Sequence, residues 1–333
     1  MMPRRAFLGS AVSVGTTALF GLRAGRAAAE APPETTRIRL AKYPAICTAP
    51  QFISEQLLRA EGFSDTQYLT RPGFGWTLKA LATGDIDIAV GYVTNVIMQV
   101  DAGDPVVLLG GVHVGCYELF GSQRVRAVRD LRGRKVAVPE LGNSHHIFAS
   151  MMVSHVGIDP RKDIEWVIHP TDESKNLLAE VKVDALMAFP PDPQELRAKK
   201  IGHVMVSSAL DRPWSQYFCC MIYANKEFVR KHPVAAKRAV RAILKATDVC
   251  ATEPERAARS LVDQDISKSY EYTLQALKDL PYNRWREFDP TDTVRFWSLR
   301  LHEAGLIKSG PNKIVAQGTD WRFFNELKRE LKG

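Results

Sequence analysis

The chain has 333 residues, 45% of them apolar and 25% charged, which is enough for two lobes that each bury a core. Its formal net charge of +8 includes four arginines within residues 1–29, a segment without acidic residues, so the remainder carries about +4. No dense basic stripe is interleaved with aromatic residues, which argues against nucleic-acid binding. Five irregularly spaced cysteines give neither a disulfide framework nor a CxxC zinc motif.

Residues 1–29 resemble a twin-arginine export signal. Arg4 and Arg5 precede a weakly apolar run over residues 9–22, and the small residues 27–29 follow like a cleavage site. The apolar run is shorter than the roughly 20 residues that span a bilayer, which disfavours a membrane anchor. The alternative is a basic, alanine-rich tail without a targeting role. We expect export to the periplasm and a soluble mature protein.

The first part of the mature chain alternates between strand and helix patterns. Residues 37–41 predict a strand, 43–49 a turn, and helical apolar spacing from Phe52 to Ala60 a helix that ends at Gly62. Further along, the patterns predict a strand over 66–70, a short helix that ends at Gly84, a buried strand over 86–90, a helix from about Thr94 and a strand over 106–109.

The sequence pattern of residues 83–91 is repeated at residues 181–189. Each stretch ends an apolar helix, passes through a short acidic strand and stops at a turn before another helix. We interpret Asp85, Asp87 and Asp184 in these stretches as structural residues at strand starts. Around the second copy, the patterns predict strands over 135–138, 164–168, 183–189 and 203–207, and helices that begin near 143, 177 and 192. This alternation predicts an α/β fold with mostly parallel sheets covered on both faces.

The remaining chain is less repetitive. An aromatic and cysteine-rich strand is predicted over 215–223, and the chain that follows it is helical in pattern, with Trp285, Trp297 and Trp321 as packing residues. We expect one lobe over 37–118 plus 220–333 and a second over 122–215. The two crossings, near 115–122 and 214–223, would form a hinge on which the lobes close.

The cysteines and histidines do not indicate a metal site. Buried small side chains are the favoured interpretation for the five cysteines, which are Cys47, Cys116, Cys219, Cys220 and Cys250. On a regular strand, Cys219 and Cys220 would point to opposite faces. His145 and His146 would project about a hundred degrees apart on a helix, with His155 almost three turns away, so they suit one metal poorly.

Two phrases carry a family resemblance. Residues 78–87 (LKALATGDID) and 130–139 (DLRGRKVAVP) resemble the nitrate/sulfonate/taurine-type substrate-binding proteins of ABC importers, a group that shares its fold with thiamine-pyrimidine synthases. The resemblance implies a type II periplasmic-binding-protein fold, in which two α/β lobes are joined by a two-crossing hinge. It also implies a membrane permease as partner.

The candidate ligand site lies at the turns after the predicted strands, because ligands of open α/β sheets bind beyond the carboxyl ends of the strands. These turns cover 43–48, 91–95, 142–145 and 189–192, and helix N-termini within them favour the oxygens of a sulfonate, carboxylate or nitrate. The candidate ligand-binding residues are Tyr43, Cys47, Thr48, Tyr92, Thr94, Asn95, Asn143, Ser144, His145, Phe189 and Pro190. Alternatively, Thr48, Thr94 and Ser144 are ordinary helix N-caps.

The function predicted from these features is capture of a small polar or anionic solute for an ABC importer. No catalytic residue, cofactor or metal is expected, and the protein is expected to be a monomer. One alternative is a thiamine-pyrimidine-synthase-like enzyme, because Phe218-Cys219-Cys220 is faintly similar to the cysteine-rich run of those synthases. The other is a ligand-loaded sensor that docks on a membrane receptor.

Overall fold

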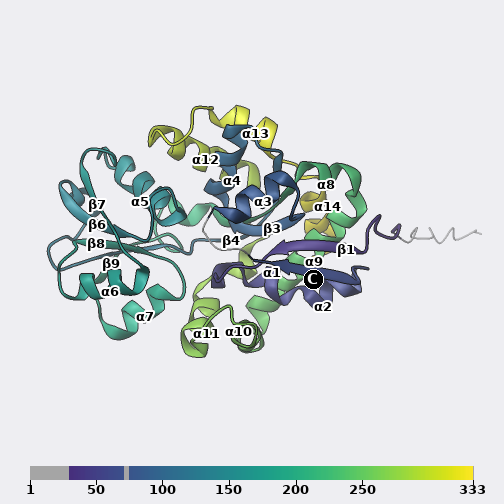
Figure 1. Cartoon of the computed structure of the whole chain (residues 1–333), viewed down its shortest axis with the longest axis horizontal. Helices are drawn as coiled ribbons and strands as arrows, with labels where there is room; N and C mark the ends of the chain where they lie inside the picture. The colour runs from purple at the N-terminus through teal and green to yellow at the C-terminus, as the bar shows by residue number, and fades with distance from the viewer. Residues whose placement is uncertain (1–29, 71–74, 333) are drawn as a thin grey trace, which may run out of the picture. The chain divides into compact units, whose positions relative to one another are not determined.

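The computed structural model describes residues 30–70 and 75–332. The predicted export signal therefore lies outside the described residues. Two five-stranded sheets with flanking helices make up the chain from Pro32 onward (Figure 1). None of the helices in the described part of the chain is long and apolar enough to cross a membrane. The α/β architecture predicted from the sequence is confirmed.

The first sheet has the strand order β2-β1-β3-β10-β4. Strands β1, β2 and β3 are parallel, whereas β10 enters between β3 and β4 and is antiparallel to both. Its strands are β1 (Arg37–Ala41), β2 (Asp65–Leu69), β3 (Ile88–Tyr92), β4 (Val106–Val114) and β10 (Phe218–Asn225). The helical segments between them are η1 (Ile46–Thr48), α1 (Ala49–Ile53), α2 (Glu55–Ala60), α3 (Trp76–Thr83) and α4 (Val93–Ala102).

The second sheet repeats this plan with the order β7-β6-β8-β5-β9. Its antiparallel strand is β5, which follows the first crossing just as β10 follows the second. Its strands are β5 (Glu118–Gly121), β6 (Arg134–Val138), β7 (Ile164–Ile168), β8 (Ala185–Ala188) and β9 (His203–Ser207). Helix α5 (Ser144–His155) lies on one face of this sheet, and α6 (Thr171–Ala179) and α7 (Asp192–Lys199) lie on the other (Figure 1). A short η2 (Val128–Leu131) precedes β6.

Helices dominate the rest of the chain. They are η3 (Trp214–Gln216), α8 (Lys226–Lys231), α9 (Pro233–Thr252), α10 (Pro254–Asp263), α11 (Tyr270–Asp279), η4 (Tyr282–Arg284), α12 (Pro290–Glu303), α13 (Pro311–Gly318) and α14 (Arg322–Glu330). Trp285 and Trp297 are fully buried and Trp321 is partly buried against the same core, which confirms their predicted packing role.

Several helices and strands begin or end at other residues than the sequence predicted. The helix predicted from Phe52 to Ala60 is divided at Ser54 into α1 and α2, and the Ser54 hydroxyl donates a hydrogen bond to the Gln51 carbonyl there. Strand β3 begins at Ile88, two residues later than predicted, and β4 continues to Val114 because β10 pairs along its whole length. Gly84 ends α3 in the left-handed conformation, with φ of 77°, as its position predicted.

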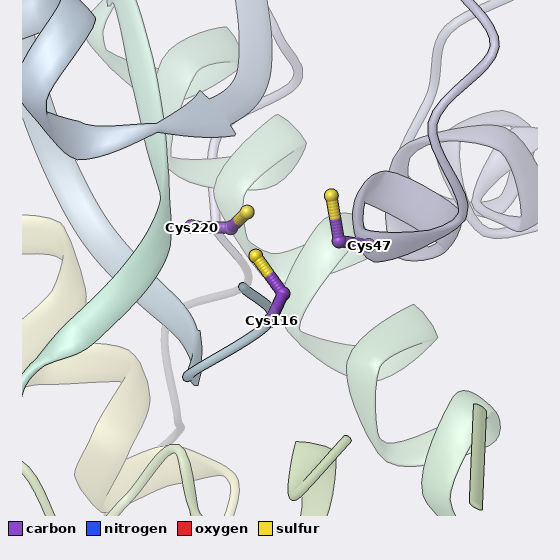
Figure 2. A group of neighbouring side chains, drawn as sticks. All are labelled: Cys47, Cys116 and Cys220. Atoms are coloured by element: carbon purple, nitrogen blue, oxygen red, sulfur yellow. The ribbon is translucent and has the colours of Figure 1, made fainter. Parts of the chain in front are cut away.

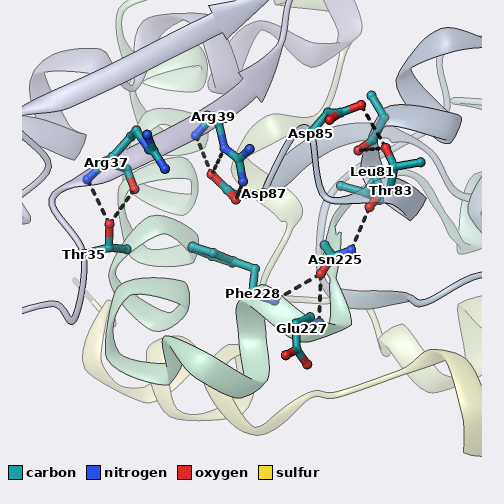
Figure 3. Close-up of polar contacts among 11 residues, drawn as sticks. Thr35, Arg37, Arg39, Leu81, Thr83, Asp85, Asp87, Asn225, Glu227 and Phe228 are labelled. Carbon is teal, nitrogen blue, oxygen red and sulfur yellow. Dashed lines mark hydrogen bonds and ion pairs between the residues drawn. The ribbon is translucent and has the colours of Figure 1, made fainter.

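The acidic residues of the repeated stretch are structural, as predicted. Asp87 accepts a hydrogen bond from the Arg39 backbone N–H and pairs with the Arg39 guanidinium, with an N–O distance of 2.6 Å (Figure 3). In the second copy, Asp184 accepts a hydrogen bond from the Lys135 backbone N–H. Asp85 accepts one from the Thr83 hydroxyl at the end of α3. The Asp87 and Asp184 carboxylates thus tie the residue before one strand to a neighbouring strand, and none of the three aspartates is on the pocket lining.

Candidate functional site

A pocket of about 470 Å³ lies where the carboxyl ends of strands from both sheets meet. Its volume falls in the range usual for small-molecule sites. From the first sheet and its connections it is lined by Lys42, Tyr43, Pro44, Ala45, Cys47, Thr48, Thr70, Trp76, Thr77, Leu78, Tyr92, Asn95 and Tyr223. From the first crossing and the second sheet it is lined by Tyr117, Pro139, Ser144, His145, Thr171, Phe189 and Asp192.

Most residues predicted as ligand contacts lie on this lining. They are Tyr43, Cys47, Thr48, Tyr92, Asn95, Ser144, His145 and Phe189. Three others lie outside it, namely Thr94, Asn143 and Pro190. The Asn143 side chain accepts a hydrogen bond from the His146 backbone N–H and so caps α5. Thr94 is fully buried in the first turn of α4, and Pro190 belongs to the turn between β8 and α7.

Thr48 occupies the N-cap position of α1 without a side-chain cap, whereas Thr94 and Ser144 are not N-cap residues, so the capping interpretation fails for these two. Thr48 precedes α1 but makes no side-chain cap, and its hydroxyl donates to the Ala45 carbonyl instead. Thr94 and Ser144 lie inside the first turns of α4 and α5. On the pocket lining, the hydroxyl groups of Thr48 and Ser144 therefore have no capping role.

Several lining residues were missed from the sequence. Lys42 directly follows β1, one position before the turn that was singled out, and that adjacency is the one signal that could have identified it. Tyr117 lies on the first crossing and Tyr223 on β10. Both residues reach the pocket because of how the chain passes between the two sheets, and no local sequence pattern predicts that path.

Several buried polar atoms on the pocket lining have no hydrogen-bond partner among the described residues. They include the Tyr92 hydroxyl, the Asn95 side-chain oxygen and both ring nitrogens of His145. A buried polar group without a partner costs roughly 1–3 kcal/mol, so native proteins rarely leave several together. Their convergence on one cavity indicates a position where a polar molecule can complete the hydrogen bonds.

His145 is neutral at physiological pH. Its ring is 1% exposed, and burial lowers its pKa to about 3. The ring packs against Phe189, with centroids 4.7 Å apart, and against Tyr117 at 5.7 Å. A neutral imidazole offers one N–H donor and one acceptor nitrogen, so His145 can bind either a donor or an acceptor group.

Two charged residues on the pocket lining, Lys42 and Asp192, differ in whether they form an ion pair. Lys42 forms no ion pair with any residue in the described ranges, so its ammonium is available to a bound anion. Asp192, in contrast, is paired with the Lys175 ammonium at 3.1 Å. Burial raises the pKa of Tyr92 and of Tyr117 well above the usual value, so both phenols stay protonated. The N-terminal ends of α4 and α5 add partial positive charge beside the lining residues Asn95 and Ser144.

Four cysteines lie together beside one end of the pocket. The Cys116 and Cys219 sulfur atoms are 2.8 Å apart, and those of Cys47, Cys116 and Cys220 all lie within 4.8 Å of one another. The prediction that Cys219 and Cys220 face opposite sides is wrong, because the register of β10 shifts at Cys220 and both sulfurs approach Cys116. All five cysteines are buried, as predicted.

His113 joins this group through the backbone. One ring nitrogen lies 3.0 Å from the Cys47 carbonyl oxygen, and the other lies 3.1 Å from that of Gly115. Hydrogen bonds from neighbouring thiols, that of Cys116 first, and the His113 charge lower the pKa of the Cys220 thiol well below its usual range. Burial raises the pKa of the Cys116 thiol. The group thus holds one readily ionised thiol among neutral ones.

This fold and pocket define the class of periplasmic-binding-protein structures. The chain is similar to the periplasmic nitrate-binding protein NrtA from Synechocystis PCC 6803, with 16% identity, a TM-score of 0.76 and coverage of 91% of this chain and 90% of that one. It is similar to the periplasmic aliphatic sulphonate binding protein SsuA from Escherichia coli (16% identity, TM-score 0.67, coverage 86% and 94%). It is also similar to the alkanesulfonate-binding SsuA from Xanthomonas axonopodis pv. citri bound to MOPS (14% identity, TM-score 0.67, coverage 86% and 99%).

The family model described as NMT1/THI5 like matches residues 67–257, more than half of the chain, and the protein belongs to that family. A comparison with curated proteins gives no match. The family match and the shared fold confirm the resemblance inferred from residues 78–87 and 130–139. The two-lobe α/β fold that it implied is confirmed as well.

Proposed function

We propose that this protein captures a small polar or anionic solute in the pocket between its two sheets and delivers it to the permease of an ABC importer. The observation that carries the proposal is the group of buried atoms on Tyr92, Asn95 and His145 that line one cavity and have no partner within the described residues. The names of the similar binding proteins support the same role.

The solute contacts are proposed on both walls. Lys42 and Asn95 would contact it from the first sheet, and Ser144 and His145 from the second. An oxyanion suits Lys42 and the two helix N-termini, while the aromatic lining suits an apolar or planar body. Nitrate, sulfonates, carboxylates and pyrimidines are therefore the solutes to screen.

We further propose that the lobes close on the solute. One lobe would cover 37–118 plus 220–333 and the other 122–215, with crossings near 115–122 and 214–223. The strand orders support this division, because each sheet receives its antiparallel strand directly after a crossing. The protein is proposed to act as a monomer in the periplasm.

The test is a thermal-shift screen of the mature chain with nitrate, alkane- and arylsulfonates, taurine, small carboxylates and pyrimidines. A ligand at a hundredfold excess over its Kd adds about 2.7 kcal/mol to the stability, which is a readily measured shift. His145→Gln should lose the response and His155→Gln, at the exposed end of the same helix, should keep it. The absence of any shift, together with turnover of a screened compound, would overturn the transport proposal.

An enzyme is the second candidate, since Cys47 lies on the pocket lining and beside other thiols. The same incubations, followed by NMR, distinguish the two functions. Unchanged ligand recovered after prolonged incubation supports binding. Product that disappears in Cys47→Ser supports catalysis.

Export is proposed to use the twin-arginine signal of residues 1–29. Replacing both Arg4 and Arg5 with Lys should leave the precursor in the cytoplasm, as followed by cell fractionation and immunoblotting. Replacing Arg23 and Arg26 in the same way is the matched control and should preserve export. If the Arg4 and Arg5 variant is exported at the wild-type rate, the twin-arginine route is wrong and the general secretory route takes its place.

A further inference from the structure

Three cysteines from distant parts of the chain meet beside the pocket. Cys47 lies in η1, Cys116 on the link between β4 and β5, and Cys220 in β10. Their sulfur atoms all lie within 4.8 Å of one another, and Figure 2 shows the three side chains as neighbours that come from three separate segments. Each residue is at most 7% exposed. Three sulfurs at this separation can reach a single ion of ordinary metal–sulfur bond length, about 2.3 Å.

We propose that Cys47, Cys116 and Cys220 bind one Cu(I) ion as a three-thiolate site. The proposal is independent of the solute and of the importer. On binding, the thiols act as thiolates and their protons pass to solvent, while copper keeps its oxidation state.

The backbone around each sulfur is fixed, which preorganises the group. The Cys47 carbonyl oxygen accepts hydrogen bonds from His113 at 3.0 Å and from the Tyr282 hydroxyl at 3.2 Å. The Cys116 backbone N–H donates to the Ser208 hydroxyl at 3.0 Å. Cys220 is paired on both sides within the first sheet. A site whose ligands are held in place loses little entropy when the ion binds.

The three sulfur ligands determine which metal ion the site would bind. Among the described residues, no imidazole nitrogen or carboxylate oxygen joins the three sulfurs in a larger group. Structural zinc sites are almost always four-coordinate, so a three-sulfur set suits zinc poorly. Soft thiolate ligands suit both Cu(I) and zinc, so the number of sulfur ligands, and not their type, favours Cu(I) at this site. The fourth nearby cysteine, Cys219, contacts Cys116 and lies outside the group of three.

The other candidate metal group has a different explanation. Asp172, Asp192 and Glu195 also lie close together. The Lys175 ammonium occupies their centre and pairs with all three carboxylates. That cluster is an ion-pair network around a lysine of the protein itself, and it carries no inference of a metal site.

The direct test is anaerobic titration of the reduced mature protein with Cu(I) in the presence of a chromogenic Cu(I) chelator. We expect one Cu(I) per chain to be retained against the chelator, and X-ray absorption of that sample to show three sulfur neighbours. Retention of no copper, or a copper shell of nitrogen and oxygen, would overturn the proposal. This measurement uses the wild-type protein, so its outcome does not depend on whether any variant folds.

Serine variants identify the ligands. Cys47→Ser, Cys116→Ser and Cys220→Ser should each weaken Cu(I) binding by more than about a hundredfold, because losing a ligand costs more than losing an outer contact. Cys250→Ser replaces a fully buried cysteine elsewhere in the chain and should bind as the wild type does. Cys219→Ser should do so too. Wild-type affinity in Cys47→Ser or Cys220→Ser would contradict the site.

A parallel titration with Zn(II) separates the two ions. We expect Zn(II) to be removed by a chelator that leaves Cu(I) in place. Retention of Zn(II) by the same three cysteines, with loss of Cu(I), would overturn the assignment to copper.

Discussion

The two walls of the pocket are built on one plan but differ in their chemistry. The wall from the first sheet carries the Lys42 ammonium, which forms no ion pair with the residues that the structure describes, and the cysteine group lies beside this wall at Cys47. The wall from the second sheet carries the neutral imidazole of His145, and its one carboxylate, Asp192, is paired with Lys175. The shared plan of the two sheets therefore places their walls around one pocket, and the residues on each wall determine what that wall offers a ligand.

The largest expected effect concerns the aspartates that start the repeated strands. Asp87 pairs with Arg39 at 2.6 Å, whereas Asp184 meets the half-exposed Arg124 at 3.4 Å. Asp87→Asn should lower the free energy of unfolding by about 3 kcal/mol, because it leaves a part-buried guanidinium without its carboxylate. Asp184→Asn retains an acceptor for the Lys135 N–H and should cost less than about 1 kcal/mol. Urea unfolding of both variants measures the difference.

Equal costs for Asp87→Asn and Asp184→Asn would contradict this account of the two copies. The comparison is matched, since the same substitution is made at equivalent strand starts. Both aspartates are also remote from the pocket lining, so solute binding should change little in either variant.

The next effect is the pH dependence that His145 contributes. Its pKa is about 3 in the folded protein, against about 6.5 when unfolded, so the unfolded chain binds the additional proton between these values. Stability must then rise with pH over this window and fall on acidification. Between pH 7 and pH 5 the loss from His145 should be about 2 kcal/mol.

His145→Gln removes that contribution, so its unfolding free energy should fall less than that of the wild type from pH 7 to pH 5. Denaturant unfolding at both pH values provides the measurement. A slope for His145→Gln identical to that of the wild type would show that this imidazole is not buried as a neutral group.

The smallest effect concerns the ammonium of the first wall. Lys42→Gln should weaken the binding of an anionic solute by about tenfold, which corresponds to roughly 1.4 kcal/mol, and leave the binding of a neutral solute unchanged. Isothermal titration at two salt concentrations measures it, because the Lys42 contribution should decrease at high salt. Lys79→Gln, outside the pocket lining, is a matched control. An equal loss for anionic and neutral solutes would assign Lys42 a role in packing instead of charge.

Local patterns predicted the parts of the fold that depend on local sequence. The strands over 37–41 and 164–168, the stop at Gly84 and the packing tryptophans follow from periodicity and from the preferences of glycine. The pocket turns followed from one general rule, that ligands bind at the carboxyl ends of strands. This rule identified Tyr92, Asn95 and His145 as pocket residues. It does not say which side chains of a turn face the pocket, so it also selected Thr94 and Asn143, which are not on the lining.

What the sequence did not reveal depends on distant segments. Tyr223 reaches the pocket because β10 enters the first sheet between β3 and β4, and no pattern within residues 215–223 indicates that position. The thiol group was missed for the same reason. Cys47, Cys116 and Cys220 have no metal-binding spacing in the sequence and meet only because the two crossings lie beside η1.

The central claim is that one solute contacts both walls of the pocket. A crystal structure of the mature chain, grown with the compound that gives the largest thermal shift, tests it most directly. We expect the solute to lie within contact distance of Lys42 or Asn95 on one side and of Ser144 or His145 on the other. A solute bound outside this pocket, or one that contacts a single wall without the other, would contradict it.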